Sequence, residues 1–148
     1  MKSVLQTLKE MVIKTMEQSF TGILIYAEKV PQNGNSHCFG VTIKSVEQKP
    51  LLKGRREQWI TICVEYQNYL EKRPKAESTE KAEQLYDVLA LVGEKENQFF
   101  AGKMHHTMTE KGFYFEAVYY VQLQSVMTDS KMEKLEYNDT KLVGYEKR

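Results

Sequence analysis

The sequence predicts an α+β fold, in which a mostly antiparallel sheet of about five strands is flanked by two helices. The main observation is a run of alternating residues from Gly112 to Ser125, which is typical of one long strand with two different faces. Two amphipathic segments elsewhere have the spacing of helices that pack on a sheet. Short turn-forming segments separate the strands and favour antiparallel pairing. The expected element order is α-β-β-β-α-β-β, followed by a polar C-terminal tail.

The first predicted helix covers residues 3–20. Ser3 and Gln6 have the spacing of a capping box, in which each side chain bonds the backbone of the other residue. Gly22 lies near the position where a left-handed residue often closes a helix. Apolar residues repeat at helical spacing and predict one buried face, made by Val4, Leu5, Leu8, Met11, Val12 and Met16.

The second predicted helix runs from about Thr79 to Val92. Ser78 is the expected N-cap, because its side chain can accept a hydrogen bond from a free backbone N–H of the first turn. Gly93 is the expected C-terminal stop. Residues 69–78 before the helix are expected to be a solvated connection. The buried face of the helix should contain Ala82, Leu85, Tyr86, Leu89 and Val92.

The remaining strands are predicted from alternation bounded by turn residues. Residues 48–57 are expected to form a loop rich in positive charge, because Pro50 and Gly54 interrupt a regular element. The strand after this loop is apolar on both faces, which suits a central strand covered on both sides. These four strands are expected at residues 23–30, 37–47, 58–66 and 98–109.

The chain is expected to form one domain followed by a tail. Residues 1–125 carry all the predicted helices and strands, and the periodic pattern fades after Ser125. Residues 126–148 are mostly charged and polar, with scattered apolar side chains. We interpret them as a polar tail or an arm that becomes ordered only on a partner.

The amino-acid composition argues against several classes of protein. The 148 residues include 21 Lys and Arg and 20 Asp and Glu, which gives a net charge of +1. A near-neutral chain argues against general nucleic-acid binding, which usually needs a strongly basic face. Cys38 and Cys63 lie in apolar strand-like runs and are interpreted as buried thiols in a reducing compartment. The sequence has neither a secretory signal nor an apolar window long enough to span a membrane, so synthesis and folding in the cytoplasm are expected.

No motif indicates an enzyme or a metal site. His105 and His106 are neighbours, and adjacent residues of a strand point to opposite faces, so this pair is poorly placed to chelate one metal ion. No serine, cysteine or threonine lies in a nucleophile-elbow setting, and no Gly-rich loop has phosphate-cradling spacing. The expectation is a protein without catalytic residues, metal or cofactor.

The candidate interface has two parts. Lys49, Lys53, Arg55 and Arg56 cluster in the predicted loop, which is either merely solvated or contacts an acidic protein surface or a phosphate backbone. Tyr114 and Tyr120 share one face of the long strand. They belong to the core if the sheet is covered on both sides. If they face outward, they are suited to a protein interface, where tyrosine is enriched.

Taken together, these segments resemble the phage tail terminator family over about residues 1–125. The resemblance rests on the order and spacing of elements rather than on an invariant signature. The segments that carry it are Phe20–Tyr26, His37–Ile43, Leu51–Arg56, Trp59–Tyr66, Ala82–Leu89 and Phe113–Tyr120.

The resemblance implies a structural protein that catalyses nothing. Such proteins form a six-fold ring on the head-proximal end of the tail tube, stop its polymerisation and offer a surface to the head. They occur in phages, in prophages and in phage-tail-like particles. The implied partners are other copies of the chain, the tail tube protein and a head–tail connector protein, with DNA only in passage and no membrane. The implied location is the virion tail, after synthesis in the bacterial host cytoplasm.

Two other functions stay open at this point. A head–tail connector or stopper protein has a similar size and also forms rings. A small ligand-binding or regulatory α+β domain is the alternative from a different class, and it requires an apolar pocket with a few converging polar groups.

Overall fold

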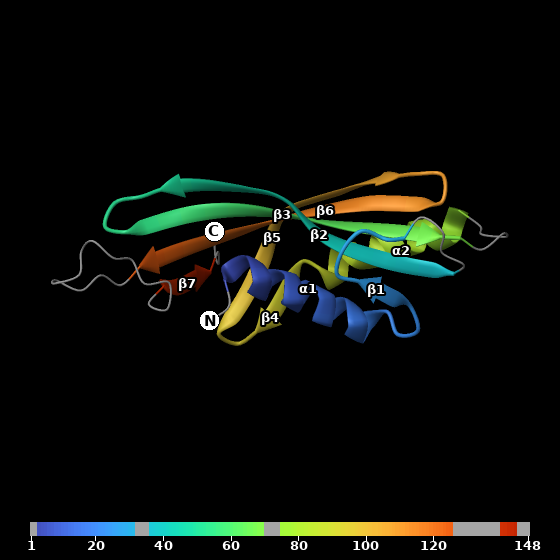
Figure 1. Ribbon diagram of the computed structural model, residues 1–148, viewed down its shortest axis with the longest axis horizontal. Coiled ribbons are helices and arrows are strands. Elements are labelled where there is room, and N and C mark those ends of the chain that lie inside the picture. Colours follow the sequence, from blue (N-terminus) through green and yellow to red (C-terminus); the bar gives the residue numbers. More distant parts are fainter. Residues whose placement is uncertain (1–2, 32–35, 70–74, 126–139, 145–148) are drawn as a thin grey trace.

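The computed structural model describes residues 3–31, 36–69, 75–125 and 140–144 (Figure 1). These described residues form two helices and seven strands. In order they are α1 (Val4–Ser19), β1 (Leu24–Tyr26), β2 (His37–Pro50), β3 (Arg55–Asn68), α2 (Lys75–Val88), β4 (Leu91–Glu94), β5 (Asn97–Met108), β6 (Gly112–Ser125) and β7 (Thr140–Gly144).

The strands form one sheet in the order β1-β2-β3-β6-β5-β4, and β7 pairs with the end of β6. Among the strands of the described residues, β1 and β2 pair in parallel, and every other pair of neighbours is antiparallel. The prediction of an α+β fold with a mostly antiparallel sheet is therefore confirmed. Sequence analysis did not find β4 and β7, which are short strands of four and five residues.

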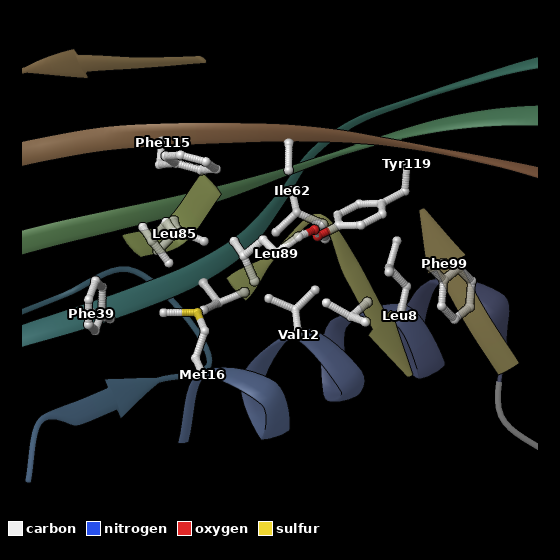
Figure 2. Close-up of a cluster of buried hydrophobic side chains, with 14 of the residues drawn as sticks. Leu8, Val12, Met16, Phe39, Ile62, Leu85, Leu89, Phe99, Phe115 and Tyr119 are labelled. Carbon is white, nitrogen blue, oxygen red and sulfur yellow. Dashed lines mark hydrogen bonds between the residues drawn. The ribbon is translucent and has the colours of Figure 1, made fainter. Parts of the chain in front are cut away.

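One face of the sheet carries the hydrophobic core (Figure 2). Leu8, Val12 and Met16 of α1, Leu85 of α2 and Leu89 just after α2 point toward this face, and all are fully buried. The alternation predicted for β6 is confirmed, since one set of its side chains is buried throughout. This set contains Phe113, Phe115, Ala117, Tyr119, Val121 and Leu123, and it faces Ile60, Ile62, Val64 and Tyr66 of β3.

The N-terminal helix forms as its sequence predicts. The backbone N–H of Gln6 donates to Ser3 Oγ at 3.1 Å, and the Ser3 N–H donates to Gln6 Oε1 at 3.3 Å, which completes the capping box. The helix ends at Ser19, and Phe20 is its C-cap. Gly22 follows with a φ of 85°, so a left-handed glycine does stand just beyond the helix. None of the described helices is long and apolar enough to cross a lipid bilayer.

The boundaries predicted for α2 are wrong at both ends. The helix begins at Lys75, so Ser78 lies inside it, with its side chain buried, and is not the N-cap. The early start is favoured by tertiary contacts: Glu77 in the first turn accepts hydrogen bonds from the hydroxyl of Tyr66 and, at 3.0 Å, from Asn68 Nδ2. A sequence pattern contains no information about these contacts with β3.

The predicted helix stop at Gly93 is also wrong. The helix ends at Val88, and Gly93 belongs to β4, where its φ is 104°. A Cβ at this position would lie 1.8 Å from the carbonyl oxygen of Asn97, so glycine is required by the tight β4–β5 connection and not by a helix end. Val92 is buried as expected, but it reaches the core from β4.

The predicted loop at residues 48–57 is instead the end of a β-hairpin. Lys53 and Gly54 have φ values of 63° and 75°, and the Arg55 N–H donates to the Leu52 carbonyl at 3.3 Å, which are the features of a type I′ turn. The next hydrogen bond joins the Leu51 N–H to the Arg55 carbonyl at 2.7 Å. Pro50 comes directly before Leu51 and is the last residue of β2. Because backbone N–H groups alternate in direction along a strand, the nitrogen of Pro50 points away from β3, and the absence of an N–H there costs no hydrogen bond with β3.

Strand pairing also changes the predicted first strand and the predicted C-terminal tail. The strand expected at residues 23–30 is limited to β1, which pairs with only three residues of β2. Most of the predicted tail, residues 126–139 and 145–148, lies outside the described residues, and Thr140–Gly144 forms β7. Cys38 and Cys63 are free thiols, opposite Gln67 and Thr42 respectively on the β2–β3 ladder.

Candidate interface: the open face of the sheet and its projecting hairpin

The face of the sheet opposite the core is called the open face here. By alternation it carries Trp59, Cys63 and Glu65 from β3 and Tyr114 and Tyr120 from β6. β3 is central in the sheet, as predicted, but only one of its faces is packed against helices. No helix in the described part of the chain covers the open face, so the expectation that β3 is covered on both sides is wrong for these residues.

β3 is paired with β6 from Arg55 onward, so only the turn of the β2–β3 hairpin extends past the end of β6 (Figure 1). The four predicted basic residues lie at three positions of this hairpin. Lys53 is exposed in the turn itself. Lys49 is opposite Glu57 on the open face, and Arg55, two residues from Glu57 along β3, is on that same face. Arg56 is on the core side, half-buried and opposite Leu123 of β6. The hairpin therefore does not present the four charges as one patch.

Tyr120 is held in place at the base of this hairpin. Its ring packs on Trp59 with centroids 5.4 Å apart, and its hydroxyl donates a hydrogen bond to Glu57. Both Trp59 and Tyr120 are half-buried. These contacts fix an aromatic pair on the open face next to the basic hairpin.

Tyr114 lies six residues away from Tyr120 on the same strand, which is roughly 20 Å for an extended chain. Its side chain is 44% exposed. The nearby carboxylate of Glu65 and, to a smaller extent, partial burial raise the pKa of Tyr114. The structure therefore places the two predicted tyrosines at separate ends of the open face and does not bring them together.

A depression of about 620 Å³ surrounds Tyr114 on the open face. It is lined by residues that include Lys29, Gly40, Glu65, Tyr69 and Lys111. Sequence analysis did not find this feature, because its residues come from four separate segments of the chain. The lining is polar and charged, unlike the mostly apolar pockets that hold small ligands.

The middle of the open face carries an ionic cluster that sequence analysis also missed. Lys44 of β2 forms a salt bridge with Glu116 of β6, and His105 Nε2 of β5 lies 3.5 Å from the second oxygen of Glu116. The hydrogen bond to Glu116 raises the pKa of Lys44. His106 points to the core side, where it contacts Tyr86, so the two histidines lie on opposite faces as their adjacency predicts.

The two thiols are not activated for chemistry. Burial, followed by the nearby carboxylates of Glu65 for Cys38 and Glu116 for Cys63, raises the pKa of each cysteine. A thiol with a raised pKa is protonated at neutral pH, whereas the thiolate is the nucleophile. The open face thus offers aromatic rings, ion pairs and hydrogen-bonding groups, a combination suited to contact with another protein.

The two tyrosines are expected to respond differently to truncation. Tyr120→Ala should lower the free energy of unfolding by about 1–3 kcal/mol, because it removes the ring pair with Trp59 and the hydrogen bond to Glu57. Tyr114→Ala should cost less, at most about 1 kcal/mol, since 44% of this residue is exposed. Urea denaturation of both variants measures this difference, and equal losses would contradict the assignment of Tyr120 as the anchored residue.

A family model described as phage tail terminator protein matches residues 7–134, which include most of α1 and all of the chain from β1 to β6. No curated protein matches the chain.

Proposed function

This chain belongs to the phage tail terminator family, and we propose that it caps the head-proximal end of the tail tube, stops tube polymerisation and forms part of the interface to the head. Membership of the family makes the protein a structural component of a phage tail. The match over residues 7–134 is the observation that carries the proposal, because it includes the core, the open face and the projecting hairpin in one unit.

The proposed assembly is a six-fold ring of this chain on the end of the tube. A closed ring needs two different surfaces on each subunit that meet head to tail. The projecting β2–β3 hairpin and the open face supply surfaces of different chemistry. The near-neutral net charge suits a channel through which DNA passes without being held.

The proposed contact residues are Lys49, Lys53, Arg55 and Arg56 of the hairpin together with Tyr114 and Tyr120 of the open face. Lys49, Lys53 and Arg55 are exposed, whereas Arg56 is half-buried. Arg56 supports the hairpin from the core side. The proposed partners are neighbouring copies, the tube protein and the head–tail connector protein. Synthesis takes place in the bacterial host cytoplasm, and the protein then resides in the virion tail or in a phage-tail-like particle.

A head–tail connector or stopper is the nearest alternative, and tail length separates it from a terminator. In particles made without this gene, imaged by negative stain, we expect tubes longer than normal and lacking heads, because nothing stops addition of tube subunits. Supplying the gene from a plasmid should restore the normal length. Tails of normal length without heads would assign the protein to the connector. Particles identical to the natural ones would favour a ligand-binding or regulatory domain.

A further inference from the structure

The tip of the β2–β3 hairpin combines positive charge with one exposed apolar side chain. Leu52 is 79% exposed, which is the highest value among the large apolar residues that the structure describes. Lys53 and Arg55 follow it and are exposed as well. Residues 48–56 of the sequence contain no Asp or Glu. Such a tip is suited to an acidic surface that also offers room for a leucine.

The outer face of α2 has the complementary charge. Glu80, Glu83 and Asp87 are all exposed, and their spacing of three and four residues places them on one side of the helix. The opposite side of the helix is buried through Ala82 and Leu85, and Leu89 just beyond the helix is buried as well. None of the three carboxylates forms a salt bridge with another described residue. The lysine of this helix turn, Lys81, lies 3.8 Å from Glu77 instead.

The two surfaces lie far apart within one molecule. The hairpin tip adjoins Arg55 at the start of β3, and the first turn of α2 binds Asn68 at the end of β3 through Glu77. The 14 residues of β3 span roughly 45 Å at the rise of an extended strand. Figure 1 shows the hairpin tip at the left end of the molecule and α2 toward the right. One copy therefore cannot join its own hairpin to its own helix.

We propose that the hairpin tip of one copy docks on the outer face of α2 of the next copy. Lys53 and Arg55 of one copy contact the carboxylates of the next copy, which belong to Glu80, Glu83 and Asp87. Leu52 packs against the surface of α2 between these carboxylates. Two different surfaces meet in this contact, so repeating it generates a ring or an open array, as a head-to-tail interface does. The proposal rests on the proposed function, because it names the contact between subunits of the ring.

The contact is tested by charge reversal in both surfaces. One variant carries Lys53→Glu with Arg55→Glu, and the other carries Glu80→Lys, Glu83→Lys and Asp87→Lys. Each is produced in particle-forming cells that lack the natural gene, and the amount bound to purified tails is measured by immunoblot. The amount of either variant bound to tails, when it is produced alone, should fall by about tenfold or more, because the hairpin tip and the outer face of α2 then carry like charges. Co-production of both should restore binding to within about twofold, because each altered surface then meets an opposite charge on the other variant.

The rescue separates a lost contact from a misfolded chain, since two misfolded variants do not restore each other. The matched control carries Glu17→Lys, Glu96→Lys and Glu110→Lys, which reverses three exposed carboxylates elsewhere and should bind tails normally. Normal binding of either test variant alone would overturn the proposal. So would a failure of rescue, which would assign the hairpin to the tube protein instead. Tail length in the strain lacking the gene is scored separately, so the proposed function can stand when this contact fails.

Discussion

Replacing Gly112 with alanine is expected to destabilise the protein by roughly 3 kcal/mol or more. Gly112 is the first residue of β6 and is opposite Gln67, at one end of the ladder between the two central strands β3 and β6. A Cβ at this position would lie 1.7 Å from the carbonyl oxygen of Tyr66 and 2.6 Å from its carbonyl carbon. These are backbone atoms, so neither a side-chain rotation nor a small local movement removes the overlap. The two strands must therefore separate at this end of their ladder, next to the buried pair of Tyr66 and Phe113.

Gly102→Ala is the matched control for this prediction. Gly102 is also in the sheet, but a Cβ there would meet only the carbonyl oxygen of Val118, at 4.0 Å. This variant should therefore remain within about 0.5 kcal/mol of the natural protein. Urea denaturation followed by circular dichroism measures both variants. Similar stabilities for the two would contradict the close approach of β6 to the backbone of Tyr66.

Stability is expected to fall steeply above about pH 10, because two buried tyrosines must remain protonated in the folded state. Burial raises the pKa of Tyr119, and its hydroxyl donates to the Leu89 carbonyl at 2.7 Å. Burial and then the hydrogen bond to Glu77 raise the pKa of Tyr66. Both side chains are fully buried. An ionised phenol would lose its donated hydrogen bond and leave a charge inside the core.

The direction of this effect follows from proton binding. The pKa of each tyrosine is higher in the folded state than in the unfolded state, so above about pH 10 the unfolded chain loses protons that the folded chain keeps. The stability is fully present below that pH and is lost as the pH rises. Each such tyrosine lowers the free energy of unfolding by about 1.4 kcal/mol per pH unit until its own folded-state pKa is reached.

Tyr119→Phe isolates the contribution of one tyrosine. At pH 8 this variant should lose about 1 kcal/mol, because the Leu89 carbonyl loses its donor. Above about pH 10 its stability should fall less steeply than that of the natural protein, by about 1.4 kcal/mol less per pH unit, since Tyr119 no longer titrates. Urea midpoints measured from pH 8 to about pH 11.5 test this. Parallel pH profiles for the two proteins would show that Tyr119 does not contribute to alkaline unfolding.

The alternation of residues 112–125 by itself determined β6 and the assignment of its faces. Every side chain predicted on its apolar face, from Phe113 to Leu123, is buried. The capping box likewise determined the start of α1. These predictions succeeded because the signal is local: a period of two residues, or two polar residues three positions apart, specifies backbone geometry without reference to the rest of the chain.

Tertiary structure decided the features whose signals come from elsewhere in the chain. The start of α2 depends on contacts of Glu77 with Tyr66 and Asn68, and Gly93 is required by the carbonyl of Asn97 rather than by a helix end. The same limit applies to the candidate interface. The sequence identified its basic and aromatic residues, but strand pairing decided that Arg56 faces the core side, that Tyr120 is anchored by Trp59, and that Tyr114 borders a depression. Pairing between distant segments sets these positions, because side-chain neighbours across a sheet depend on register and not on separation along the chain.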